Sequence, residues 1–150
     1  MDDYLLALGI GLARHCYTDC RYYLLYDSTN AFLMAVGLVR GWRMGLLEQA
    51  WQSFLLLGGL MVLVYYAARG GMGEGDVKLA AVLGLWLGVE QGLACLLLAF
   101  VSGAVVGGVM LLWKQEQGKQ LPFGPFLAGS GIACYVHGAD MLAWYWQFFN

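Results

Sequence analysis

The chain has 150 residues, of which 61% are hydrophobic and 12% are charged, with a net charge of −2. An ordinary soluble domain is about 45–50% apolar and about 25% charged, so this composition excludes a typical water-soluble globule and a disordered chain. The 8 basic and 10 acidic residues leave no basic surplus, so no nucleic-acid partner is expected. The composition predicts an all-α membrane protein that contacts lipid.

Six apolar segments are expected to form a polytopic bundle of transmembrane helices, each of which needs about 17–25 residues to cross a bilayer. In chain order they are 4–17, 28–39 (extending toward 42), 50–68, 77–89, 92–113 and 125–149. Several are shorter than a full span, so their ends are expected to reach the interface or pack against protein. Because no repeat or polar linker divides the chain, residues 1–150 are expected to form a single domain.

The basic residues are distributed unevenly between the connections of this expected bundle. Six of the eight follow the first, third and fifth segments: Arg14, Arg21, Arg69, Lys78, Lys114 and Lys119. The positive-inside rule places those connections in the cytoplasm, and an even number of spans then places both termini on the periplasmic side. The acidic start of the chain lacks the basic region of a cleaved signal peptide.

Two aspartates lie where they can carry chemistry, because ionisable groups beside membrane helices are costly to retain. Asp19 follows the first segment and Asp76 starts the fourth, so both are expected at the cytoplasmic face although 57 positions separate them. Two close carboxylates share a proton, so one acts as a base and the other as an acid. Such a pair activates water for peptide hydrolysis without a metal or another cofactor.

The same residues allow other interpretations. Asp76 can cap the N-terminus of its helix, and carboxylates within membranes also serve as proton relays. The run Gly73-Glu74-Gly75 before Asp76 permits unusual backbone angles and the close approach of a substrate backbone. Non-helical backbone at membrane depth is tolerated only inside protein or around a water-filled cavity. The residue types alone leave the dyad, the cap and the relay open.

The cysteines give little indication of a metal site. Cys16 and Cys20 are four positions apart beside His15, a spacing at which a metal ligand pair is conceivable. They lack the Cys-x-x-Cys spacing and the second pair that zinc sites use, so inert thiols are the favoured interpretation and no metal is predicted.

Three blocks of the sequence contain aspartates, glycines or prolines at short spacings. The first is Tyr17-Thr-Asp19 followed by Leu25-Tyr26-Asp27. The second is Gly-Met-Gly-Glu-Gly-Asp-Val-Lys-Leu at 71–79, and the third is Leu-Pro-Phe-Gly-Pro-Phe-Leu-Ala at 121–128. In this order they resemble the first aspartate block, the Gly-x-Gly-Asp block and the Pro-Phe-Gly-Pro-Phe block of the type IV prepilin peptidases, a family of GxGD aspartic membrane proteases. The blocks cover most of the chain, and their combination is highly specific.

The resemblance implies an aspartic endopeptidase of the bacterial inner membrane. Its substrates would be type IV prepilins or type II secretion pseudopilins, cut at the cytoplasmic face after a Gly to remove a short basic leader. Asp19 and Asp76 would be the catalytic pair. The other candidate motif or substrate-binding residues are Gly73, Glu74, Gly75, Lys78, Asp27, Pro122, Phe123, Gly124 and Pro125.

The roles of these other residues stay open at this point. Lys78 matches the motif lysine, for which an electrostatic or packing role is an alternative to a catalytic one. Asp27 either supports the site and contacts the basic leader, or is a solvated loop acid. The Pro122–Pro125 block either shapes the substrate channel or forms a rigid helix start.

Two departures from the family pattern qualify this expectation. Tyr26 stands where the family usually has Pro. The paired Cys-x-x-Cys segment that longer members carry, and that is associated with N-methylation of the mature pilin, is absent from this sequence. Peptidase activity without methyltransferase activity is therefore expected.

Three other functions remain as alternatives. One is another GxGD protease, such as an archaellin-type or signal-peptide-peptidase-like enzyme, although the Pro-Phe-Gly-Pro-Phe block favours the bacterial branch. A second is a catalytically inactive family member that acts as a subunit of a pilus or secretion apparatus, although both aspartates are retained. The third is a transport protein with a two-carboxylate proton relay.

Overall fold

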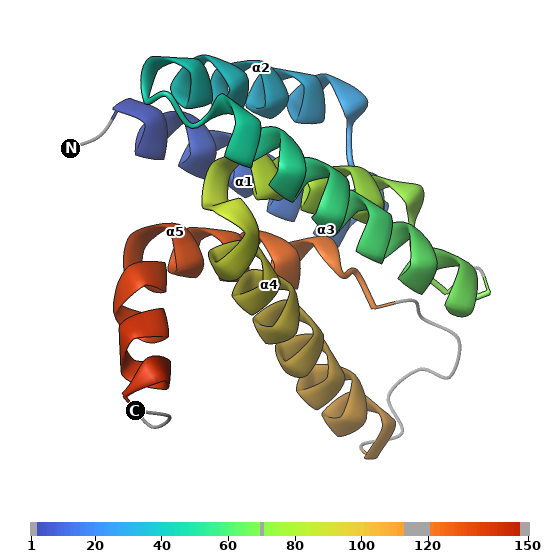
Figure 1. The fold of residues 1–150 in the computed structure, drawn as a ribbon. Helices are drawn as coiled ribbons and strands as arrows, with labels where there is room; N and C mark the ends of the chain where they lie inside the picture. Colours follow the sequence, from blue (N-terminus) through green and yellow to red (C-terminus); the bar gives the residue numbers. More distant parts are fainter. Residues whose placement is uncertain (1–2, 70, 113–120, 148–150) are drawn as a thin grey trace.

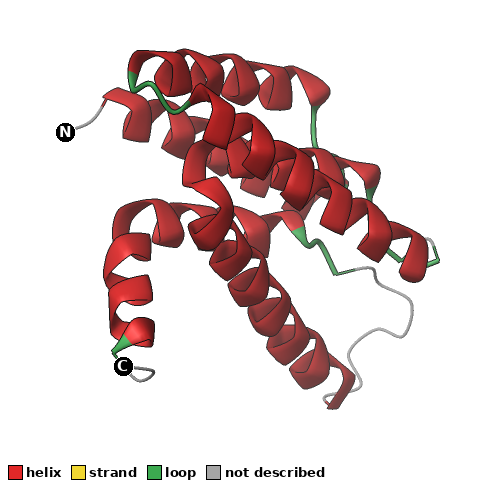
Figure 2. Ribbon diagram, viewed as in Figure 1, coloured by secondary structure: helices red, strands yellow, loops and turns green. Residues whose placement is uncertain are grey.

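The computed structural model describes residues 3–69, 71–112 and 121–147, and these ranges contain helices and no strand. The expected all-α fold class is therefore confirmed (Figures 1 and 2). The helices are α1 (Asp3–Tyr22), α2 (Asp27–Arg43), α3 (Leu47–Ala67), α4 (Glu74–Leu112) and α5 (Gly124–Trp146).

The long helix α4 is the centre of the packing. It contacts α2, α3 and α5, while α1 contacts α2 and α5. Figure 1 shows α1 and α2 side by side, α3 along the first half of α4, and the second half of α4 running away from them. Apolar side chains from all five helices form one core, in which the most fully buried large residues are Leu8, Leu12, Leu33, Leu57, Met61, Leu79, Leu83 and Leu127.

A sharp kink at Gly88 divides α4 into two halves. Gly88 has φ 78° and ψ −178°, a backbone region that is essentially restricted to glycine. The sequence predicts two separate helices here, 77–89 and 92–113. The predicted connection between them is wrong, because the helix resumes directly after the single non-helical residue Gly88 and no loop intervenes. Nothing between Val89 and Gly92 breaks a helix as a proline would.

The first two helices extend beyond their predicted ends. The first apolar segment ends at Tyr17, but α1 continues to Tyr22 because its polar residues His15, Thr18 and Asp19 are buried against the rest of the protein. The second segment extends to Arg43. Hydropathy alone places a helix end where the polar residues begin, whereas packing in the fold carries the helix past them.

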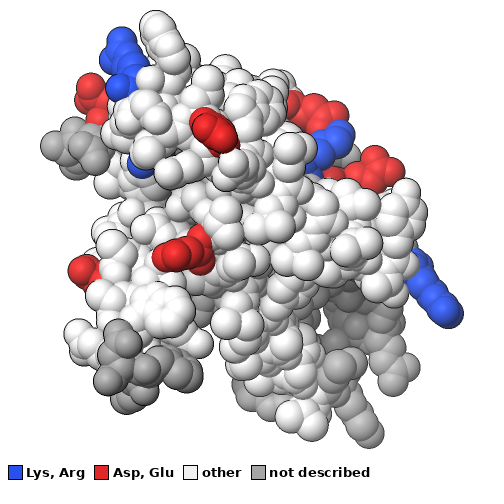
Figure 3. Space-filling view, viewed as in Figure 1, with Lys and Arg blue, Asp and Glu red and all other residues white. Residues whose placement is uncertain are grey.

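Within the described ranges, two helices are long and apolar enough to cross a membrane, the segments Leu47–Ala67 and Glu74–Met110. Large hydrophobic side chains are exposed along both, including Leu55, Leu63 and Leu97. Figure 3 shows charged atoms confined to small areas of a mostly uncharged visible surface. The sequence predicts six spans, and that number stays a prediction. Lys114 and Lys119, which are used to orient the expected bundle, lie outside the described residues.

A glycine on α4 allows close packing against α3. A Cβ atom added to Gly84 would lie 2.6 Å from the Ser53 carbonyl oxygen. A Cβ atom at Gly88, in contrast, would meet nothing within 4 Å. Gly84 therefore serves helix contact, whereas Gly88 serves the kink.

Candidate active site

A cavity of about 390 Å³ opens where three segments distant in sequence meet. The end of α1, the connection before α4 and the connection before α5 each contribute to its wall. These are the places of the three sequence blocks. Its lining residues are Asp19, Tyr23, Gly71, Met72, Gly73, Asp76, Leu121, Pro122 and Phe123.

Asp19 is held in this cavity by the start of α5. Its side chain is 7% exposed, and the backbone N–H of Gly124 donates a 2.8 Å hydrogen bond to its Oδ2 atom. A Cβ atom added to Gly124 would lie only 2.5 Å from the same oxygen, so only glycine allows this approach. Asp19 lies two residues after the apolar stretch 4–17. Burial raises the pKa of its carboxyl group, and the hydrogen bond from Gly124 opposes that rise.

Asp76 approaches the cavity from the first turn of α4. Its exposed fraction is 6%, and its Oδ1 atom is buried without a hydrogen-bond partner among the described residues. Because α4 begins at Glu74, Asp76 lies inside the helix and is not its N-cap. Buried polar atoms are rarely left unpaired, so this oxygen makes Asp76 a candidate functional group. The charge of Asp19 acts on Asp76, as expected for neighbouring carboxylates.

The two motif glycines have different surroundings. A Cβ atom at Gly75 would lie 2.7 Å from the Leu25 Cβ atom, so Gly75 lets the start of α4 pack against the α1–α2 connection. A Cβ atom at Gly73 would make only an ordinary 3.5 Å contact with Asp76 Oδ2, and Gly73 lines the cavity. Gly75 thus positions α4, whereas Gly73 keeps the wall beside Asp76 open.

Asp27 and Lys78 form an ion pair with each other outside the cavity lining. Lys78 Nζ lies 2.8 Å from Asp27 Oδ1, and the two side chains are 50% and 73% exposed, respectively. The pair connects the first turn of α2 to α4 two residues after Asp76. Glu74 is also exposed and is absent from the lining. Tyr26 precedes α2, and its carbonyl accepts hydrogen bonds from the next turn.

The proline-containing block forms one wall of the cavity and then starts α5. Pro122 and Phe123 line the cavity, and the Phe123 ring lies 5.1 Å from the ring of Phe100 on α4. Pro125 lies in the first turn of α5, where a missing N–H costs no hydrogen bond, and it does not line the cavity. Pro122 and Phe123 therefore belong to the cavity wall, whereas Pro125 belongs to the start of α5.

Sequence reasoning missed several lining residues. The motifs do not single out Gly71, Met72 and Leu121 individually, although all three residues lie within the sequence blocks. Tyr23 has a positive φ of 52°, an uncommon conformation for a tyrosine, and no local pattern indicates it.

The residues beside Asp19 include two cysteines and a histidine. Cys16 and Cys20 are free thiols, and no group of three or more potential metal ligands occurs among the described residues. His15 is completely buried, and neither ring nitrogen has a hydrogen-bond partner there.

Comparisons with known proteins identify the family. Residues 6–108 match the type IV leader peptidase family. A prepilin leader peptidase/N-methyltransferase of Stutzerimonas stutzeri is 36% identical over 96% of this chain and 53% of its own length. Proteins of the same name from Xanthomonas campestris and Bacillus subtilis are 33% and 34% identical over 87% and 76% of this chain.

The chain spans about half the length of these curated relatives. No solved structure matches it significantly. The family match covers more than half of the chain and includes both Asp19 and Asp76. The chain belongs to the type IV leader peptidase family.

Proposed function

We propose that this chain is a membrane aspartic endopeptidase that removes the leader peptide from a type IV prepilin or a type II secretion pseudopilin. The observation that carries the proposal is the cavity in which Asp19 and Asp76 are both buried and both line the wall. Its location at the three matched blocks supports the assignment. Membership of the leader peptidase family supports the prepilin class of substrate.

Hydrolysis by this pair needs one proton shared between two carboxyl groups. Two neighbouring carboxylates resist double ionisation, so one is charged and the other carries a proton. The charged group takes a proton from water, whose oxygen attacks the peptide carbonyl carbon. The other group protonates the leaving amine, and the proton gained from water restores the pair. In this mechanism the Gly124 N–H holds Asp19 in place, and Asp76 Oδ1 is free to contact water or the peptide.

The wall of the cavity suits a peptide backbone beside the aspartates. Gly71 and Gly73 present no side chain beyond the main chain, so an extended substrate can approach closely. Pro122 and Phe123 provide an apolar surface on the other side. In the proposal, the exposed acids Asp27 and Glu74 lie on the path of a basic leader, although Lys78 already pairs with Asp27.

The proposed location is the bacterial inner membrane, with cleavage at the cytoplasmic face and both termini in the periplasm. The apolar segments Leu47–Ala67 and Glu74–Met110 support membrane insertion. The six-span topology counts the two halves of α4 separately. A reporter that is active only in the periplasm, fused after Asn150, is expected to be active. A reporter active only in the cytoplasm, fused at the same place, would overturn the topology if it were active.

The direct test is cleavage of a full-length prepilin by the purified chain in detergent or liposomes. Mass spectrometry of the mature product identifies the cleaved bond, which is expected to follow a Gly before the apolar pilin helix. An absence of cleavage under conditions in which a known prepilin peptidase cuts the same substrate would favour a non-catalytic subunit. Cleavage within the apolar helix would favour another kind of intramembrane protease.

The same spectra test the expectation of peptidase activity alone. The curated relatives are named as peptidases and N-methyltransferases. With S-adenosylmethionine added, the expected product has an unmodified N-terminus. A mass increase of one methyl group on that N-terminus would contradict the expectation.

A further inference from the structure

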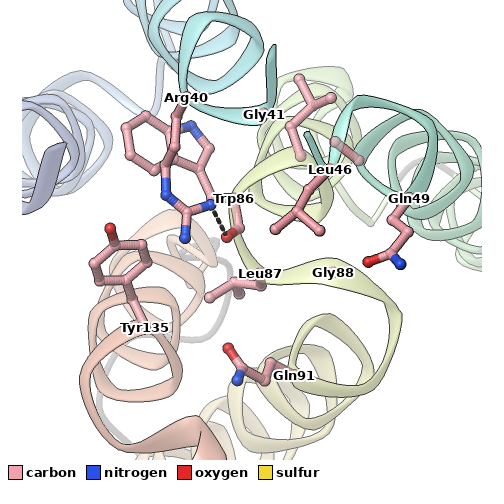
Figure 4. Close-up of a pocket in the computed structure, with 11 residues that line it drawn as sticks. Arg40, Gly41, Leu46, Gln49, Trp86, Leu87, Gly88, Gln91 and Tyr135 are labelled. Atoms are coloured by element: carbon pink, nitrogen blue, oxygen red, sulfur yellow. Dashed lines mark hydrogen bonds between the residues drawn. The ribbon is translucent and has the colours of Figure 1, made fainter. Parts of the chain in front are cut away.

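A second cavity lies at the kink of α4, away from the aspartates (Figure 4). Its volume is about 370 Å³, within the usual range of small-molecule sites. We call it the Arg40 cavity. It is lined by Arg40, Gly41, Leu46, Gln49, Ala50, Leu85, Trp86, Leu87, Gly88, Gln91 and Tyr135.

Arg40 is fixed at the edge of this cavity by contacts with two other helices. Its Nη1 atom donates a 3.0 Å hydrogen bond to the carbonyl of Trp86, just before the kink. Its guanidinium carbon lies 5.3 Å from the centre of the Tyr135 ring on α5. Trp86 in turn donates a 3.0 Å hydrogen bond to the Leu33 carbonyl on α2. The guanidinium group is therefore pre-organised, which reduces the entropy cost of binding a ligand.

The cavity offers hydrogen-bond donors and no negative charge. Arg40 is the one charged residue in its lining, and its Nε atom is buried without a partner among the described residues. The side-chain amides of Gln49 and Gln91 line the cavity, as does the Tyr135 ring (Figure 4). The single hydrogen bond from the guanidinium group to the Trp86 carbonyl leaves further N–H donors, which an anion with several acceptor oxygens would satisfy.

We propose that the Arg40 cavity is a binding site for a phosphate-bearing anion. A phosphate group has enough oxygens to accept hydrogen bonds from the guanidinium group and from both glutamine amides at once. Arginine also pairs with phosphate through two parallel hydrogen bonds. The source of the phosphate is either the headgroup of an anionic lipid or a soluble phosphate ester, which share this chemistry.

The location of the cavity favours access from the membrane interface. Gly88 lies twelve residues after Asp76, about 18 Å along the helix axis, so the cavity is well separated from the candidate active site. Trp42, two residues after Arg40, is highly exposed, and Trp51 on α3 is also exposed. Exposed tryptophans are typical of the membrane–water interface, where lipid phosphates lie. The proposal does not depend on peptidase activity.

The test compares thermal unfolding of the detergent-purified chain with three probes. These are phosphatidylglycerol, diacylglycerol with the same acyl chains, and glycerol 1-phosphate. A ligand that binds only the folded state raises Tm in proportion to the logarithm of its concentration over Kd. Phosphatidylglycerol or glycerol 1-phosphate is expected to raise Tm, and diacylglycerol is not. A response to the lipid alone identifies a headgroup site, whereas a response to both identifies a general phosphate site.

Three variants connect the response to the cavity. Arg40→Gln is expected to need at least tenfold more phosphatidylglycerol for the same rise in Tm. Arg43→Gln removes the same charge from an exposed position three residues away and should respond like the wild type. Gln91→Met keeps Arg40 and its bond to Trp86, so it tests the site even where Arg40→Gln fails to fold.

Three results would overturn the proposal. The first is an equal response to diacylglycerol, which lacks the phosphate. The second is an unchanged phosphatidylglycerol response in both Gln91→Met and a folded Arg40→Gln. The third is an equal loss in Arg43→Gln, which would show general charge attraction rather than a site.

Discussion

The backbone N–H of Gly124 donates a 2.8 Å hydrogen bond to Asp19 Oδ2, and 105 positions of sequence separate the two residues. This contact fixes the end of α1 to the start of α5 at the wall of the cavity. It also gives Gly124 a role that a helix start alone would not require. Any side chain at Gly124 must move the carboxylate or the helix, because a Cβ atom would lie 2.5 Å from Asp19 Oδ2.

Gly124→Ala is therefore expected to reduce prepilin cleavage by about 10- to 100-fold, because a displacement of about 1 Å at a catalytic group has effects of that size. The measurement is the cleavage rate of detergent-purified protein. Gly129→Ala on the same helix is the control, since a Cβ atom there meets nothing within 4 Å. Wild-type activity in Gly124→Ala would show that the contact does not position Asp19.

The two motif glycines are expected to respond differently to alanine. Gly75→Ala places a Cβ atom 2.7 Å from Leu25 Cβ, and such overpacking typically costs about 1–3 kcal/mol. Gly73→Ala makes only a 3.5 Å contact, so its Tm is expected to stay close to that of the wild type. Thermal unfolding of both variants measures the difference. Equal destabilisation of the two would contradict the packing role assigned to Gly75.

The exposed Asp27–Lys78 ion pair is expected to contribute little to stability. Pairs of this kind are weakened by solvent and by the entropy of two long side chains. Asp27→Asn and Lys78→Gln should each lower Tm slightly, and the difference from the wild type should shrink as salt is added. The exchange Asp27→Lys with Lys78→Asp tests the pairing itself. A large loss of Tm that is independent of salt would show that these side chains have another structural role.

Gly88 is expected to tolerate alanine poorly because of its backbone conformation. Its φ of 78° with ψ of −178° lies in a region that side chains rarely adopt, at a cost of about 1–3 kcal/mol. Gly88→Ala should therefore lower Tm or straighten α4. Gly59→Ala, on α3 with nothing within 4 Å, should be neutral or slightly stabilising. If both variants unfold alike, the kink does not depend on glycine.

The sequence predicts those parts of the fold that depend on apolar composition and on order along the chain. The helical class and the approximate position of each helix follow from runs of hydrophobic residues. The shared location of Asp19 and Asp76 follows from counting spans, since alternate connections return to the same face. The sequence places a break at residues 90–91, whereas the observed kink lies two residues earlier at Gly88 and depends on the backbone conformation of that glycine.

Contacts between distant residues could not be predicted in this way. Nothing in the local pattern indicates that the N–H of Gly124 points at Asp19, or that Lys78 pairs with Asp27. From the sequence alone, Arg40 is one of two basic residues expected on the periplasmic side of the bundle. Its hydrogen bond reaches the Trp86 carbonyl two residues before the kink, a contact between helices that hydropathy does not indicate.

The central claim is tested most directly by prepilin cleavage with each carboxylate replaced in turn by its uncharged isostere. Asp19→Asn and Asp76→Asn are each expected to reduce the cleavage rate by at least about 100-fold, the usual minimum for losing an acid–base group. Asp27→Asn and Glu74→Gln, which remove nearby acids outside the cavity lining, should retain far more activity. Wild-type cleavage by a folded Asp19→Asn or Asp76→Asn variant would contradict the account.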